Sequence, residues 1–75
     1  MWIRSQDMTR LFMPYGMCID EFDGEFVISD TGGLGRCATY STKEKALKVL
    51  DMIEKVSTYQ GNTLFQMPAD DEVEV

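Results

Sequence analysis

The sequence predicts an α+β fold: a small, mostly antiparallel sheet of four or five strands with one amphipathic helix packed on one face. Two observations support this prediction. The segment "YSTKEKALKVLDMIEKVSTYQGN" has apolar residues at helical spacing, whereas the segments around it are short and broken by glycine or proline. The 75 residues make one domain, and a domain of this size buries only about 60% of its unfolded surface. We therefore expect a homo-oligomer that completes the core.

The expected strands follow from alternating polarity and from turn residues. They lie at about residues 2–7, 11–13, 17–22, 25–29, 34–40 and 63–67. Pro14 and Gly16 follow the second segment and end it. The dipeptide Asp23-Gly24 favours a tight hairpin between the third and fourth segments, because both central residues of a type I′ turn need positive φ.

The helix is expected at about residues 42–60. Ser41 as N-cap and Glu44 three residues later form a capping box. Gly61 supplies the C-terminal stop, with Asn62 as the alternative. The apolar stripe that faces the sheet consists of Ala46, Val49, Leu50, Ile53 and Val56.

The apolar surface of this helix is wider than one sheet covers. Leu47 and Met52 lie on opposite flanks of the stripe, and one sheet covers a stripe of roughly 100°. We therefore expect Leu47, Met52 and Val56 to contact another subunit. The alternative is that Leu47 or Met52 is simply an exposed hydrophobic residue, which is common.

The net charge of −6 is concentrated at the C-terminus. Four acidic residues and no basic one lie in "DDEVEV", which leaves nine acidic and seven basic residues, a net charge of −2, in residues 1–69. We expect residues 1–68 to form the domain and residues 69–75 to be a disordered acidic tail. Direct nucleic-acid binding is not expected, since it needs clustered Lys and Arg.

The same features point to the cytoplasm and away from catalysis. The segment "MWIRSQDMTR" lacks the apolar core of a signal peptide, and no apolar run approaches the roughly 20 residues that cross a bilayer. Cys18 and Cys37 could form one disulfide, but cytosolic thiols stay reduced. The chain has no histidine, so neither a zinc site nor a histidine-activated nucleophile is expected. No catalytic residue, metal or cofactor is predicted.

The stretch "VISDTGGLGR" contains two patterns that occur in active sites. Its Asp-Thr-Gly triplet matches aspartic proteases, but those enzymes need two such loops and a flap hairpin. Its glycines lack the Lys-Ser/Thr pair of a P-loop and lead into a strand instead of a helix. The stretch therefore predicts a connection between strands, in which Gly32, Gly33 and Gly35 adopt conformations that other residues avoid.

The first expected strand carries the best candidate ligand site. Trp2, Arg4 and Gln6 share one face of it. An indole ring can stack on a base, a guanidinium can bind a phosphate and an amide can bind a base edge. Arg36 is a further candidate contact for an anion. The alternative is that Trp2 packs into the core or an interface and that Arg4 pairs with a nearby acid.

Three segments together resemble a family of small phage and prophage proteins of Gram-positive bacteria. They are the opening "MWIRSQD", the helix "STKEKALKVLDMIEK" and the close "FQMPADDEVEV", about half of the chain. The middle, including "SDTGGLGR", does not match. The resemblance implies a setting, the bacterial cytoplasm during infection or lysogeny, and no particular activity.

Small phage proteins without catalytic residues usually act by binding. The first hypothesis is an oligomeric sponge that sequesters a nucleotide-derived signal of bacterial immunity through Trp2, Arg4, Gln6 and Arg36. The second is a protein-binding inhibitor of a host nucleic-acid enzyme, with the acidic residues forming a DNA-like surface. The third is a minor assembly factor of the virion. Enzymatic action on a nucleotide is the least expected.

Overall fold

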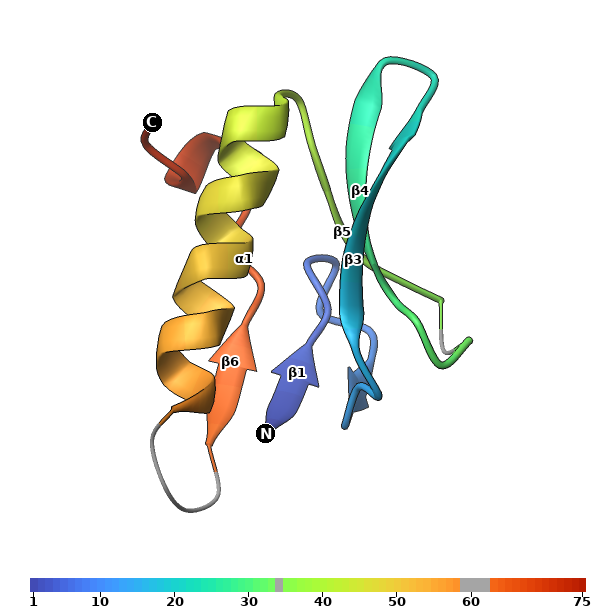
Figure 1. Ribbon diagram of the computed structural model, residues 1–75, viewed down its shortest axis with the longest axis vertical. Helices are drawn as coiled ribbons and strands as arrows, with labels where there is room; N and C mark the ends of the chain where they lie inside the picture. Colours follow the sequence, from blue (N-terminus) through green and yellow to red (C-terminus); the bar gives the residue numbers. More distant parts are fainter. Residues whose placement is uncertain (34, 59–62) are drawn as a thin grey trace.

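The computed structural model describes residues 1–33, 35–58 and 63–75. In these residues the α+β class is confirmed (Figure 1). The elements in chain order are β1 (Trp2–Arg4), β2 (Leu11–Phe12), β3 (Met17–Phe22), β4 (Glu25–Asp30), β5 (Gly35–Tyr40), α1 (Lys43–Ser57), β6 (Leu64–Gln66) and the 3-10 helix η1 (Asp70–Glu72). The predicted strand start at Leu34, helix end at Gln60 and stop at Gly61 or Asn62 lie outside the described residues.

The described strands form two sheets instead of the one sheet of four or five strands that was predicted. The N-terminal sheet has the order β2-β1-β6, and the hairpin sheet has the order β3-β4-β5. Strands β1 and β6 are parallel, and the other pairs are antiparallel. The single sheet was wrong because the first strand stops at Arg4 and not at Asp7. The chain turns there, with the Met8 N–H donating to the Ser5 carbonyl and the Ser5 N–H to the Arg10 carbonyl.

One cluster of buried residues draws on both sheets and on α1. Ile3, at the centre of the N-terminal sheet, lies in register with Phe12 on one side and Phe65 on the other, and all three are buried. The hairpin sheet and α1 contribute Ile28, Cys37, Ala38, Tyr40, Ala46, Val49 and Ile53. Helix α1 packs against the hairpin sheet (Figure 1). The inner face of the N-terminal sheet contributes its buried residues to the same core cluster.

The hairpin predicted at Asp23-Gly24 is confirmed. Asp23 has φ 52° and Gly24 has φ 78°, both in the left-handed region that a type I′ turn requires. Strand β3 begins and ends where the sequence predicts, and β4 extends one residue further, to Asp30. The pairing of β4 with β5 shifts between Ile28 and Ser29, a local bulge that the alternation of polarity does not reveal.

The helix begins one residue later than the capping box predicted. Its N-cap is Thr42, whose hydroxyl accepts a hydrogen bond from the Lys45 N–H, while Ser41 bonds instead to Asp70. The helix ends at Ser57, and the N–H of Thr58 donates to the carbonyls of Lys55 and Val56. No helix in the described ranges has the length and apolar character needed to cross a membrane.

Gln6 joins the two sheets. Its side-chain amide accepts a hydrogen bond from the Thr39 N–H at 3.0 Å and donates to the Thr39 carbonyl at 3.1 Å. It also donates to the Pro68 carbonyl at 3.1 Å, which accepts a second bond from the buried Tyr40 hydroxyl at 2.8 Å. One side chain therefore ties the turn after β1 to strand β5 and to the segment after β6.

Replacing this side chain should destabilise the fold. In Gln6→Ala, two backbone groups of Thr39 and the carbonyl of Pro68 lose a partner, and we expect the free energy of unfolding to fall by about 2 kcal/mol. Urea unfolding followed by circular dichroism measures this. Gln66→Ala is the control, because the exposed Gln66 amide only donates to carbonyls, those of Ser5 and Met67. Equal losses in the two variants would contradict a joining role for Gln6.

The acidic tail differs from the disordered segment that the sequence predicted. Residues 70–72 form η1, and Val73 is buried in the core cluster. The Asp70 carboxylate accepts hydrogen bonds from the backbone N–H and the hydroxyl of Ser41 and forms an ion pair with Lys45 at 3.2 Å. Figure 1 accordingly shows the C-terminal end beside the first turns of α1. The tail folds back because it carries an apolar residue, Val73, between its acids.

The contacts of Asp70 predict a pH-dependent contribution to stability. The backbone hydrogen bond from Ser41 is the main cause that holds the pKa of Asp70 below its usual 3.8. Because the pKa is lower in the folded state, the stabilisation is present above 3.8 and is lost as the pH falls through the folded-state pKa. Asp70→Asn should therefore be less stable than wild type at neutral pH, and this difference should disappear in acid.

Urea midpoints measured across this pH range test the prediction. Asp71→Asn is the matched control, since Asp71 is the neighbouring acid and is exposed. A midpoint that falls equally in both variants, or a difference that persists in acid, would argue against the contact of Asp70 with Ser41 and Lys45.

Candidate binding surface

The side of the N-terminal sheet that faces away from the core is the candidate binding surface. Strand alternation turns Ile3, Phe12 and Phe65 inward, so their neighbours turn outward. In register, Trp2 lies beside Leu64, and Arg4 lies between Leu11 and Gln66. These five residues are called the outer face below: Trp2, Arg4, Leu11, Leu64 and Gln66.

The outer face has an apolar end and a polar end. At one end, Trp2 and Leu64 lie in register and leave 40% and 62% of their surface exposed, whereas Leu11, 51% exposed, lies beside Arg4. At the other end, Arg4 Nη1 donates to the Met8 carbonyl at 3.3 Å, and Gln66 donates to nearby carbonyls. The face therefore offers an exposed indole ring with a guanidinium two residues along the same strand.

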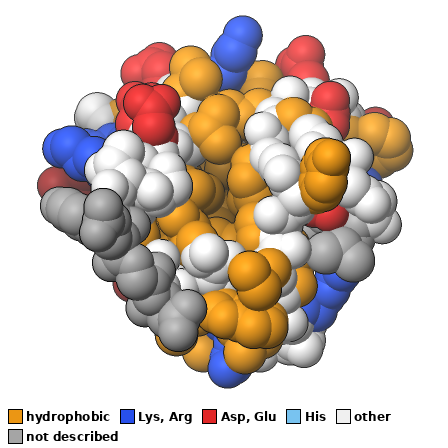
Figure 2. Space-filling model, turned by 60° about the horizontal axis from the view of Figure 1, so that its bottom comes forward, with side chains coloured by type: hydrophobic (Ala, Val, Ile, Leu, Met, Phe, Trp, Pro, Cys, Tyr) orange, Lys and Arg blue, Asp and Glu red, His pale blue; other side chains and the backbone are white. Residues whose placement is uncertain are grey.

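Figure 2 brings forward the end of the molecule where the N-terminus lies, and there hydrophobic side chains gather around a shallow hollow. Strands β1 and β6 both begin at this end (Figure 1). Besides the outer face, Met13 is exposed by 56%, and Met1 and Met17 are partly buried against the core. The N-terminal end is thus richer in exposed apolar surface than a scattering of single residues.

The other two predicted ligand residues do not lie on the outer face. Gln6 is beyond the end of β1 and is bonded to Thr39 and Pro68, so its amide has a structural role. Arg36 lies on the hairpin sheet, and its guanidinium carbon is 5.3 Å from the centre of the Phe22 ring, a cation–π contact. The structure therefore brings Trp2 and Arg4 together and separates Gln6 and Arg36 from them.

Sequence analysis missed Leu11, Leu64 and Gln66 as parts of this surface. The alternation in "TLFQM" does put Leu64 and Gln66 on one face of a strand, opposite Phe65. No local pattern indicates that this strand pairs in parallel with β1 across about 60 residues of chain. The pairing, which builds the surface, is a tertiary feature.

The Asp-Thr-Gly triplet has a structural role. The Asp30 side chain is 6% exposed, and its carboxylate accepts hydrogen bonds from the N–H groups of Tyr15 at 2.8 Å and Gly16 at 3.2 Å. It holds the connection between β2 and β3 against the end of β4. Gly33 and Gly35 have φ of 90° and 99°, as predicted, whereas the prediction for Gly32 is wrong, since its φ is not positive.

Other reactive groups do not form a catalytic arrangement in the described part of the chain. No group of three or more potential metal ligands occurs there, and every buried side-chain polar atom there has a hydrogen-bond partner. Cys18 Sγ lies 3.6 Å from both the Asp20 carboxylate and the Ser29 hydroxyl, and the sequence has no histidine to activate it. Burial raises the pKa of Cys37 to about 11, so its thiol is protonated and unreactive at neutral pH.

The two cysteines should differ in their reaction with thiol reagents. Cys18 is half-buried at a sheet edge, whereas Cys37 is buried. Ellman's reagent should modify one thiol of the native protein quickly, and the second only after urea unfolds it. Cys18→Ser should remove the fast reaction of the native protein, and Cys37→Ala should remove the reaction that appears only after unfolding in urea. Rapid modification of both thiols in the native protein would contradict the burial of Cys37.

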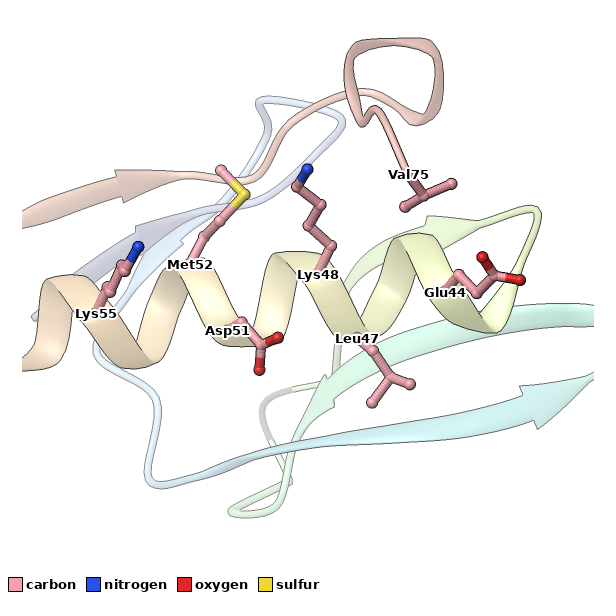
Figure 3. A pocket seen from close by; sticks show the side chains of 7 residues that line it. All are labelled: Glu44, Leu47, Lys48, Asp51, Met52, Lys55 and Val75. Atoms are coloured by element: carbon pink, nitrogen blue, oxygen red, sulfur yellow. The ribbon is translucent and has the colours of Figure 1, made fainter.

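The expected interface residues on α1 do not form one apolar patch. Leu47 is 43% and Met52 38% exposed, while Val56 is half-buried against the core and is largely unavailable to a partner. An open groove on the helix surface is lined by Glu44, Leu47, Lys48, Asp51, Met52, Lys55 and Val75. Figure 3 shows Met52 and Lys48 on the side of α1 that faces Val75, whereas Leu47 points away from it.

Comparison of the chain with protein-family models, with curated protein sequences and with solved structures finds no match in any of the three. The function is therefore argued from the outer face itself.

Proposed function

We propose that this chain is a phage-encoded binding protein, not an enzyme, that sequesters a nucleotide-derived signal of bacterial immunity as an oligomer in the host cytoplasm. The observation that supports it is the pairing of Trp2 with Arg4 on one exposed sheet face. The absence of histidine from the sequence and the structural roles of Asp30 and Cys37 favour binding over catalysis.

The two residues supply complementary contacts to a nucleotide. Stacking of a base on an aromatic ring contributes about 1–3 kcal/mol and works with any base, and the Trp2 ring is 40% exposed. A guanidinium has five N–H donors, and Arg4 Nη1 donates one hydrogen bond, to the Met8 carbonyl. The remaining donors can form charge-assisted hydrogen bonds to a phosphate. Leu64, in register with Trp2, extends the apolar end on which the base would lie.

Binding can be measured directly because Trp2 is the one tryptophan of the chain. We expect a cyclic dinucleotide, a cyclic trinucleotide or an ADP-ribose derivative to quench its fluorescence on titration. Calorimetry on the same panel gives the affinity. Arg4→Gln should weaken binding by about tenfold or more, the value of a lost charge-assisted hydrogen bond. Trp2→Leu should weaken it to a similar degree.

Arg36→Gln is the matched control, because it removes the same charge from an exposed position on the other sheet. Its affinity should stay within about twofold of wild type, since it leaves the face of Trp2 and Arg4 intact. If no member of the panel binds to folded protein, the proposal fails. If Arg36→Gln and Arg4→Gln weaken binding equally, the ligand binds elsewhere.

The competing proposal, a protein-binding inhibitor with a DNA-like surface, depends on the acidic tail. Asp70 is engaged by Ser41 and Lys45, and Glu72 accepts from the Ala69 N–H, so two of the four tail acids are used within the fold. Deleting the tail would also remove the buried Val73. The double variant Asp71→Asn and Glu74→Gln alters only exposed acids and separates the proposals. Loss of the inhibition of a host nucleic-acid enzyme in this variant would favour the inhibitor.

A further inference from the structure

The outer face of the N-terminal sheet leaves three large apolar side chains exposed to water. From their exposed fractions, Trp2, Leu11 and Leu64 together expose on the order of 300 Å² per copy, the range of a functional patch on a monomer. The three side chains lie on three adjacent strands in the order β2-β1-β6. Trp2 and Leu64 lie in register, and Leu11 lies beside Arg4, diagonally across from Trp2.

The size of this face is close to what a dimer requires. When two such faces meet, the side chains of Arg4, Gln66 and the 56% exposed Met13 add to the buried surface. The total is on the order of 1,000 Å², the lower bound for a specific interface. The polar atoms of Arg4 and Gln66 already bond to backbone carbonyls, so part of their hydrogen bonding is satisfied when the face is covered.

The alternative interface on α1 fits a second copy less well. Leu47 and Met52 are separated there by the charged side chains of Lys48 and Asp51 (Figure 3), and interface centres are depleted of charged residues. A sheet face, by contrast, matches the shape of another sheet face, and aligned sheets pack about 10 Å apart with interdigitating side chains.

We propose that two copies of this chain form a dimer through their outer faces, with Trp2, Leu11 and Leu64 buried in a two-fold interface. A two-fold axis places the same patch on both sides, so one substitution changes the interface twice. The dimer supplies the oligomer of the proposed function only with the nucleotide held between the two outer faces, because the same interface covers Trp2. Its test uses protein without ligand, so its failure and the failure of nucleotide binding are separate results.

Analytical ultracentrifugation of the ligand-free full chain over a range of concentrations tests the dimer. We expect wild type to sediment as a dimer and Leu64→Lys to sediment as a monomer, because two charges are buried per dimer. Met52→Lys is the control: it adds the same charge to the helix groove and should remain a dimer. Circular dichroism checks that each variant is folded.

A wild-type protein that stays monomeric would overturn the proposal and leave the face to a ligand or another protein. A dimer that Met52→Lys dissociates and Leu64→Lys does not would move the interface to α1. If Leu64→Lys does not fold, acrylamide quenching of wild-type Trp2 decides: protection of the ring must increase as dilute protein is concentrated. Constant quenching would contradict the dimer.

Discussion

The hydrogen bonds of Gln6 are the interaction on which the rest of the structure depends. The chain leaves β1 after three residues and must continue without leaving the open edge of β5 unpaired. The Gln6 amide meets this need, because it offers an acceptor and a donor to the two backbone groups of Thr39, as a neighbouring strand would. The Gln6 N–H extends the same edge by donating to the Cys37 carbonyl. Two short sheets thereby share one core, although neither could be stable alone.

This junction determines which side chains are left for function. Ile3 points inward between Phe12 and Phe65. Because side chains alternate along a strand, Trp2 and Arg4 therefore point outward. The apolar part of the outer face can then serve a flat ligand, a second copy of the chain, or both at one interface. A second copy would add buried apolar surface to a 75-residue core that is marginal by itself. The Arg4 guanidinium at the polar end would form charge-assisted hydrogen bonds to an anionic ligand.

The C-terminal segment shows how acidic residues can contribute to a fold. Asp70 lies beside the start of α1 and accepts bonds from Ser41, where the positive end of the helix dipole favours an anion. Val73 is buried in the core, and Pro68 accepts bonds from both Gln6 and Tyr40. The composition of this segment suggested a free tail. Its contacts make it part of the domain, and its acids are less available to a basic partner.

The sequence by itself determined the features that depend on nearest neighbours in the chain. These are the α+β class, the helix body, the hairpin at Asp23-Gly24 and the shared face of Trp2 and Arg4. Only the tertiary structure decided the rest. The division into two sheets, the parallel pairing of β1 with β6 and the seating of Val73 all join residues that are far apart in sequence. Local propensity and periodicity carry no information about such pairs, because the free energy that selects them comes from packing and from hydrogen bonds formed only in the complete fold.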